Sequence, residues 1–222
     1  MIDKSIKGIK YRLDEENLTA EVIQKKGYEG DFIIPETVVL KKVAYRVTSI
    51  GQEAFYGCSS LTSIVIPESV TSIGEEAFDG CSSLTSIVIP DGVTSIGYNA
   101  FEGCSSLTSI VVAEGNTEYD SREQCNAIIE TATNTLIRGC QNTIIPNSVT
   151  SIGEYAFDGC SSLTSIVIPD SVTSIGEEAF DGCSSLTSIV IPDGVTSIGS
   201  FAFYDCSSLT SIVIPESVTS IG

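Results

Sequence analysis

Acidic side chains are the residues of this sequence whose types and spacing best suit chemistry. Glu75 with Glu76, and Glu177 with Glu178, are adjacent carboxyl groups, the pair that glycoside hydrolysis uses. Acids that recur at matching places are oxygen ligands of the kind Ca²⁺ prefers: Asp79, Glu102, Asp158 and Asp181. The recurrence places all of them on an outer turn where no cleft is expected, and there is no D-x-D-x-D-G loop. We therefore predict solvated acids, no catalytic residue, no metal and no cofactor.

Nucleophilic catalysis is excluded by the residues that the chain lacks. The sequence has no histidine, so no Ser-His-Asp or Cys-His arrangement is available. Lysine does not occur after Lys42, which removes a Ser-Lys pair from most of the chain. Without histidine or CxxC spacing, a zinc site is also improbable. We predict that the protein is not an enzyme.

The positions of these residues follow from a repeat of 23 residues. Residues 172–194, VTSIGEEAFDGCSSLTSIVIPDG, recur letter for letter at 70–92. Copies begin at Val47, Val70, Val93, Val149, Val172 and Val195, and a partial copy begins at Val218. A period of this length is typical of a solenoid. We predict a mainly β, right-handed leucine-rich repeat solenoid with 23-residue coils.

Each coil is expected to contain two strands and one turn of helix. Leu186, Ile189 and Ile191 have the spacing L-x-x-L-x-L, which marks inward positions of one strand wall, TSIVIP. VTSIG is expected to form a second wall. EEAFDG is expected to supply about one helical turn, with Gly182 at its left-handed end. Since one coil buries too little apolar surface to offset its ordering entropy, the coils must stabilise one another.

Three ladders of identical side chains should fill the interior. The leucine ladder is Leu61, Leu84, Leu107, Leu163, Leu186 and Leu209, and the phenylalanine ladder is Phe55, Phe78, Phe101, Phe157, Phe180 and Phe203. Six cysteines occupy one slot of the repeat, and side chains in a ladder point the same way instead of toward each other. We predict free thiols at Cys58, Cys81, Cys104, Cys160, Cys183 and Cys206. Cys125 and Cys140 lie outside the repeat, and a bridge between them is left open.

Two segments depart from the repeat and divide the chain into four sections. Residues 1–46 predict a β cap, with a hairpin from IKYRL and TAEVIQ followed by a degenerate first coil. Residues 47–112 are leucine-rich repeats. Residues 113–148 contain an inserted hairpin around Thr133 and Asn134 and a shortened coil, expected to project from one edge. Residues 149–222 are repeats that end without a cap, which suggests a fragment of a longer array.

The charge excludes some partners. The net charge is −18, and residues 1–46 hold nine of the eleven Lys and Arg, so the repeats are strongly acidic. Such a surface repels phosphates and anionic lipids, and we expect no nucleic acid partner. No apolar run fits a signal peptide or a membrane span. The alternatives are a cytoplasmic chain and a piece of a precursor whose signal and anchor lie elsewhere.

The outer face of the strand wall is the candidate binding surface. Val65, Val88, Val111, Val167, Val190 and Val213 lie between inward residues and should form a stripe beside the serines two positions earlier. The predicted contact residues are Ser86, Val88, Ser109, Val111, Ser165, Val167, Ser188 and Val190. Acids edge the stripe at Glu68, Asp91, Asp170, Asp193 and Glu216. The alternative interpretation is that valines merely support one another in the ladder.

The sequence resembles one known family. IGEEAFDGCSSLTSIVIP, YRVTSIG and YDSREQCNAIIETATNTLIRGC are similar to the BspA-like leucine-rich repeat family, mostly bacterial and protozoan surface proteins. The resemblance implies a cell-surface or secreted module that binds an extracellular or host-surface protein. The alternative function is a structural spacer that presents another domain. We expect a monomer, or end-to-end association through the uncapped last coil.

Overall fold

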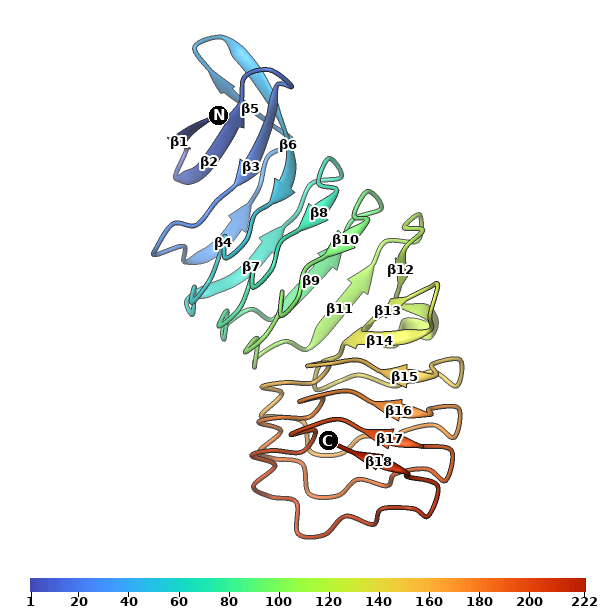
Figure 1. The fold of residues 1–222 in the computed structure, drawn as a ribbon. Coiled ribbons are helices and arrows are strands. Elements are labelled where there is room, and N and C mark those ends of the chain that lie inside the picture. The colour runs from blue at the N-terminus through green and yellow to red at the C-terminus, as the bar shows by residue number, and fades with distance from the viewer. The chain divides into compact units, whose positions relative to one another are not determined.

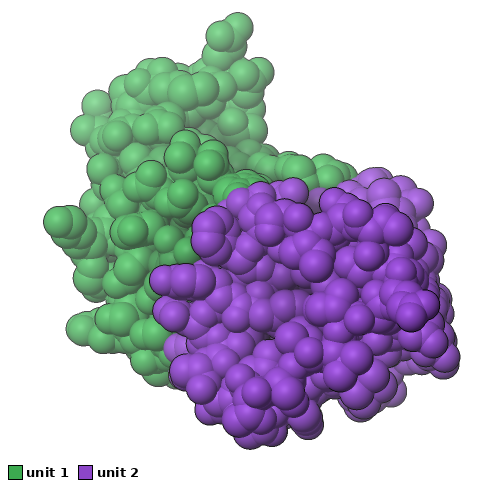
Figure 2. Space-filling view, turned by 60° about the horizontal axis from the view of Figure 1, so that its bottom comes forward, with its two compact units in different colours: residues 1–104, 113–117 green, residues 105–112, 118–222 purple.

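The computed structural model describes residues 1–222 and divides into two compact units. Unit 1 comprises residues 1–104 and 113–117, and unit 2 comprises residues 105–112 and 118–222 (Figure 2). The regular elements of both units are short strands, joined by turns and irregular segments (Figure 1). The single helical element is a 3₁₀ helix, η1 (Arg122–Gln124).

Unit 1 begins with an antiparallel sheet. β1 (Ile2–Ile6), β2 (Ile9–Asp14) and β3 (Thr19–Val22) pair in order, with Tyr11 opposite Val22 across the expected hairpin. β1 was not predicted from the sequence. Lys7 and Gly8 both have positive φ and form the tight two-residue turn that joins β1 to β2. β3 then pairs in parallel with β6 (Val43–Ile50), and β5 (Thr37–Leu40) pairs antiparallel with β6. The cap sheet therefore continues directly into the coils.

Two walls of strands follow in unit 1. β6, β8 (Ser72–Ile73) and β10 (Ser95–Ile96) form the second wall, with Ile50, Ile73 and Ile96 in register. The TSIVIP wall contains β7 (Leu61–Val65) and β9 (Ser86–Ile89). β4 (Gly30–Ile33) pairs in parallel with β7 and places Ile33 beside Val65. Residues 30–34 thus occupy the strand position of a degenerate coil.

Unit 2 contains the insertion and the last coils. Its strands are β11 (Ser109–Val112), β12 (Tyr119–Asp120), β13 (Ile128–Glu130), β14 (Thr135–Arg138), β15 (Ser151–Ile152), β16 (Ser174–Ile175), β17 (Ser197–Ile198) and β18 (Ser220–Ile221). β13 and β14 form the predicted hairpin. β14 pairs in parallel with β15, and β12 to β18 form one sheet. The expectation that the hairpin projects from an edge is therefore wrong: its second strand takes the place of a VTSIG strand.

The 23-residue period appears directly in the pairing of unit 2. Ser151, Ser174, Ser197 and Ser220 are neighbours in register, as are the isoleucines that follow them. The glycine after each isoleucine allows the coils to approach closely. A Cβ atom added to Gly176 would lie 2.5 Å from the amide nitrogen of Glu154. Only a residue without a side chain fits between these backbones.

The expected helical turn in EEAFDG is absent. Glu76 and Glu178 have φ near +50°, and Gly80 and Gly182 also have positive φ. Alternate amides in this segment bond to the next coil: Phe157 N–H donates to Ala179 O at 2.7 Å, and Phe180 N–H donates to Ala202 O at 2.9 Å. These bonds between coils replace the bonds along the chain that a helix needs. The segment closes each coil, and its bonds form a third ladder of backbone hydrogen bonds between coils, in addition to those of the two strand walls.

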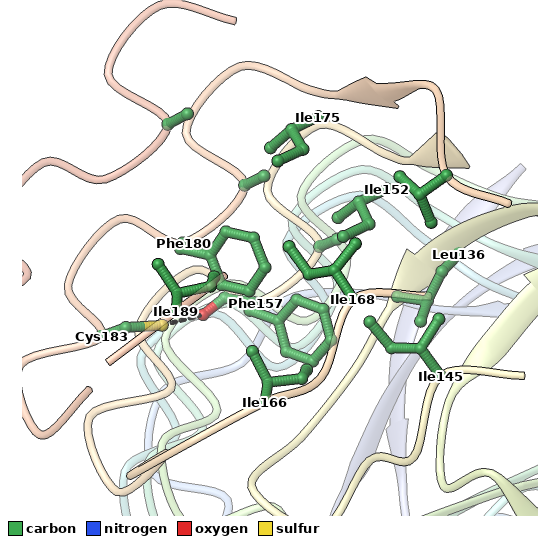
Figure 3. Close-up of a cluster of buried hydrophobic side chains, with 14 of the residues drawn as sticks. Leu136, Ile145, Ile152, Phe157, Ile166, Ile168, Ile175, Phe180, Cys183 and Ile189 are labelled. Atoms are coloured by element: carbon green, nitrogen blue, oxygen red, sulfur yellow. Dashed lines mark hydrogen bonds between the residues drawn. The ribbon is translucent and has the colours of Figure 1, made fainter. Parts of the chain in front are cut away.

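The predicted ladders occupy the core of each unit. Phe55, Phe78 and Phe101 stack in unit 1 with rings nearly parallel. Phe157, Phe180 and Phe203 stack in the same way in unit 2, and Figure 3 shows the first two of them. The phenylalanines and leucines of both ladders are buried except Phe203 and Leu209, which are half-buried. These two belong to the last full coil, so fewer side chains of this chain cover them.

All eight cysteines are buried free thiols. Four thiols of the ladder donate to the carbonyl oxygen of the preceding coil's phenylalanine, as Cys183 does to Phe157 at 3.3 Å (Figure 3). The same bond joins Cys81 to Phe55 and Cys206 to Phe180. Cys58 and Cys160 face the carbonyl oxygens of Tyr56 and Gly139 instead. The predicted free thiols are therefore confirmed, and Cys125 and Cys140 are also unbridged. The boundaries of the four predicted sections stay a prediction.

Candidate protein-binding surface

The valines of the predicted surface point outward from the wall, as alternation along a strand requires. In unit 1, Val65 and Val88 are about half exposed, at 54% and 53%. In unit 2, Val167, Val190 and Val213 are 82%, 77% and 79% exposed. The residues on both sides of each valine, such as Ile189 and Ile191, are buried except at Val213 in the last coil, where Ile212 is half-buried and Ile214 is exposed. We call the outward valines the valine stripe, described separately in each unit.

Hydrogen bonding explains why the stripe is more exposed at Val167 and Val190 than at Val111, which is 43% exposed in strand β11 of the same unit. The TSIVIP segments after residue 149 form no continuous strand pairing, and a single bridge joins Ser165 to Ser188. Thr187 N–H still donates to Thr164 O at 3.2 Å, but no ladder continues through the valines. The prediction of a regular strand wall is therefore wrong for these coils. The valine side chains of neighbouring coils cover one another less as a result.

Two isoleucines extend the stripe beyond the predicted residues. Ile33 is 71% exposed and pairs with Val65 in unit 1. Ile144 is 74% exposed in the shortened coil of unit 2, where Thr143 and Ile145 on either side of it are buried. Both precede a buried isoleucine and a proline, as Val65, Val88, Val167 and Val190 do. The sequence analysis missed these two isoleucines, which the motifs FIIP and TIIP could have identified.

The predicted serines accompany the stripe on the same outer face. Ser86, Ser165 and Ser188 are exposed, and Ser109 is half-buried. In unit 1 this row ends at an acid: Ser63 and Thr62 donate to the carboxylate of Asp31 at 2.7 and 2.9 Å. These bonds lower the pKa of Asp31. The structure brings Ser86 and Val88 together in unit 1, and Ser165, Val167, Ser188 and Val190 together in unit 2. Ser109 and Val111 also belong to unit 2.

Acidic residues edge both parts of the surface. Glu68 and Asp91 in unit 1, and Asp170, Asp193 and Glu216 in unit 2, are all exposed. No Lys or Arg follows Arg138, so the acids of the last coils have no basic side chain of these coils to neutralise them. No group of three or more His, Cys, Asp or Glu side chains is placed to hold a metal ion. The surface combines apolar contact area with negative charge.

Buried polar groups of the insertion have a structural explanation. The guanidinium of Arg138 is buried and donates to the carbonyl oxygens of Tyr155 and Asp158, both at 3.1 Å. Asp158 is also buried, and burial raises its pKa to about 6 against the opposing charge of Arg138. Elsewhere in the insertion, half-buried Arg122 forms an ion pair with Asp120 at 2.6 Å. No helix of the structure has the length and hydrophobicity of a membrane span.

These features define a leucine-rich repeat solenoid with an open, weakly featured outer wall. Residues 36–137 and 136–222 match the BspA type leucine rich repeat region, with six copies. The chain belongs to the BspA-type leucine-rich repeat family. Proteins of this family are repeat proteins typically associated with surfaces, and the family suggests a protein-binding module.

Solved structures of bacterial proteins are similar to this chain. A leucine-rich repeat protein from Bacteroides ovatus ATCC 8483 is 33% identical, with a TM-score of 0.69, over 100% of this chain and 55% of its own. TpLRR from T. pallidum is 30% identical, with a TM-score of 0.53, over 100% and 86%. The pneumococcal vaccine antigen PcpA, 18% identical with a TM-score of 0.63 over 100% and 78%, shares the fold. The chain thus spans little more than half the length of the Bacteroides ovatus protein. No curated protein matches it.

Proposed function

We propose that the protein is a non-enzymatic adhesion module of a cell-surface or secreted protein, and that the valine stripe contacts an extracellular protein partner. The observation that carries the proposal is the exposure of Val167, Val190 and Val213, each more than three-quarters accessible. A contiguous apolar strip of this kind is typical of an interaction site. An outward strip of this kind favours a broad contact over a small-molecule ligand, which binds in a concave site.

The charge around the stripe supports a choice of partner. The acidic rim favours partners with basic surfaces, because complementary charge speeds association and disfavours acidic proteins. Exposed charges are screened by salt, so the preference should weaken as ionic strength rises. An apolar centre with a charged rim is the arrangement found in protein interfaces. Bacterial surface association of the family is consistent with an extracellular partner.

The experiment compares two triple variants of the same coils. In the stripe variant, Val167, Val190 and Val213 are changed to Lys. In the control variant, Thr150, Thr173 and Thr196, which are exposed on the second wall, are changed to Lys. Immobilised wild-type chain is first used to capture extracellular-matrix and cell-surface proteins. The affinities of both variants for the captured protein are then measured.

We expect the stripe variant to lose about tenfold or more in affinity and the control to keep its affinity, since both carry the same added charge. Equal loss in both variants would mean that charge alone governs binding. Unchanged affinity in the stripe variant would contradict the proposal and direct attention to the insertion. If the wild-type chain captures no protein, the spacer function is favoured.

A further inference from the structure

One coil carries aromatic side chains at two outward positions of the repeat together, Phe201 and Tyr204. Residues 200–205, SFAFYD, occupy the place of residues 177–182, EEAFDG. Phe201 therefore replaces Glu178, and Tyr204 replaces Asp181, while Phe203 keeps its place in the stack. Asp205 replaces Gly182 and keeps its left-handed backbone, with φ of +50°. The coil keeps the fold and changes only what its outer face presents.

The two new aromatic side chains form an exposed corner. Phe201 is 61% exposed and Tyr204 is 56% exposed. Their rings are perpendicular, at 90°, with centroids 5.8 Å apart. This edge-to-face arrangement leaves ring faces accessible to solvent, and the face of an aromatic ring attracts a cation. In the coil before, Glu178 and Asp181 at the same positions are partly exposed, which shows that these positions face outward.

Carboxylates lie beside the aromatic corner. Glu178 N–H donates to Ser200 O at 2.9 Å, and Gly182 N–H donates to Tyr204 O at 3.0 Å, so the two coils are adjacent along this segment. The side chains of Glu178 and Asp181 therefore neighbour Phe201 and Tyr204. Burial and the charge of Asp205 raise the pKa of Asp181. No Lys or Arg occurs after Arg138, so the coils that carry these acids supply no basic side chain of their own.

We propose that Phe201 and Tyr204, together with Glu178 and Asp181, bind the guanidinium or ammonium group of a basic side chain on a protein partner. An arginine fits best, because its planar guanidinium stacks on a ring while its N–H groups donate to a carboxylate. The proposal rests on the protein-binding function proposed above and adds a contact that is absent from the other coils. It gives the acidic solenoid a specific site for a basic residue.

The test uses short peptides and a residue-specific signal. The whole chain is titrated with acetyl-Gly-Arg-Gly-amide, and the ring signals of Phe201 and Tyr204 are followed by NMR. A peptide with norleucine in place of arginine controls for apolar contact. We expect the arginine peptide to shift both rings and to bind about three- to tenfold more tightly than the norleucine peptide. The difference should shrink at high salt.

Two double variants separate the aromatic and the acidic contributions. Phe201→Glu with Tyr204→Asp restores the residues of the preceding coil, so it should fold, and it adds negative charge. Glu178→Gln with Asp181→Asn keeps the rings and removes two acids. We expect each variant to bind the arginine peptide at least about threefold more weakly than the wild type does. The signals of Tyr11 and Phe55, distant in sequence and buried, should not move in any titration.

Three results would overturn the proposal. One is equal binding of the arginine and norleucine peptides. Another is that the Phe201→Glu, Tyr204→Asp variant binds the arginine peptide as tightly as the wild type does. That result would show that negative charge alone attracts the peptide. The third is that neither ring signal moves. None of these would affect the proposed function, which is tested by capture of proteins and by the valine stripe variant.

Discussion

Nη2 of Arg138 donates a hydrogen bond of 3.1 Å to the carbonyl oxygen of Asp158. In a regular coil the donor to this position is a backbone amide: Gly159 N–H donates to Asp181 O, and Gly182 N–H donates to Tyr204 O. The shortened coil before residue 149 has no AFDG segment to supply that amide. The side chain of Arg138 therefore completes the row of hydrogen bonds between AFDG segments at the place where no backbone amide is available.

Replacing Arg138 with Met tests this role. The carbonyl oxygens of Tyr155 and Asp158 would lose their donor inside the protein, which we expect to cost about 2–4 kcal/mol of unfolding free energy. Arg12→Met is the matched control, because Arg12 is half exposed in its ion pairs with Asp3 and Glu21 and should cost less than about 1 kcal/mol. Urea unfolding of both variants measures the difference. Similar small losses would show that water satisfies these carbonyl groups.

The phenylalanine stack gives a prediction about packing. Phe180 is fully buried between Phe157 and Phe203, with ring centroids 5.0 and 5.4 Å away. Phe180→Ala leaves a cavity in the centre of the ladder and should cost about 3–5 kcal/mol. The same change at exposed Phe201, in the next coil, should cost less than about 1 kcal/mol. A loss below 1 kcal/mol at Phe180 would contradict its place in the core.

The identical segments show how far sequence patterns predict this structure. The inward leucines and phenylalanines follow from periodicity alone, because every coil must bury the same face. Residues 70–92 and 172–194 have the same letters, yet Ser86–Ile89 forms strand β9 while Ser188–Ile191 joins its neighbour by one bridge. The difference arises from the neighbouring coils, which a local pattern does not describe. The exposure of Val190 above that of Val88 follows from the same cause.

The prediction of a helical turn at Glu178 was wrong for a related reason. Glu and Ala favour helix locally, but the amide groups of this segment bond to the next coil, and Glu178 takes a left-handed backbone to allow it. The role of Arg138 was also unpredictable, since it depends on which amide the shortened coil lacks. Among the candidate surface residues, spacing predicts the outward valines, but it does not measure how far neighbouring coils cover them.

The cysteines should be inert in the folded protein. Burial raises the pKa of Cys125, Cys160 and Cys206 to about 11, and it raises the pKa of Cys81 and Cys183 further. At neutral pH the reactive thiolate is therefore scarce and shielded. Iodoacetamide should label none of the eight thiols in the native chain and all eight after denaturation without reductant, as counted by mass spectrometry. A count of six after denaturation would indicate a bridge outside the ladder, between Cys125 and Cys140.

Close approach of the coils predicts a graded effect of alanine. A Cβ at Gly176 would lie 2.5 Å from the amide nitrogen of Glu154, whereas at Gly153 its nearest neighbour is Leu136 O at 3.0 Å. Gly176→Ala must push two backbones apart and should cost about 1–3 kcal/mol more than Gly153→Ala. Both glycines occupy the same slot of VTSIG, so local propensity is matched. Equal unfolding midpoints in urea would show that the ladder tolerates wider spacing.

The buried carboxyl group of Asp158 predicts a pH dependence of stability. Burial raises its pKa to about 6, the nearby carboxylates of Asp181 and Glu178 add to this effect, and Arg138 opposes it. Because the folded-state pKa is above the unfolded value of about 3.9, folding favours the protonated form. The group therefore costs no stability at low pH, and its cost grows as the pH rises from about 4 to 6.

Asp158→Asn should remove this cost, since the amide carries no charge. We expect the variant to be more stable than the wild type by about 1 kcal/mol at pH 7.5, where part of the effect is screened by solvent, and nearly equal to it at pH 3.5. Asp170→Asn is the control, because Asp170 is exposed in the same coil. The difference in unfolding free energy between each variant and the wild type, measured across this pH range, checks the prediction. A destabilised Asp158→Asn variant at pH 7.5 would mean that the attraction between the Asp158 carboxylate and Arg138 outweighs the cost of burying it.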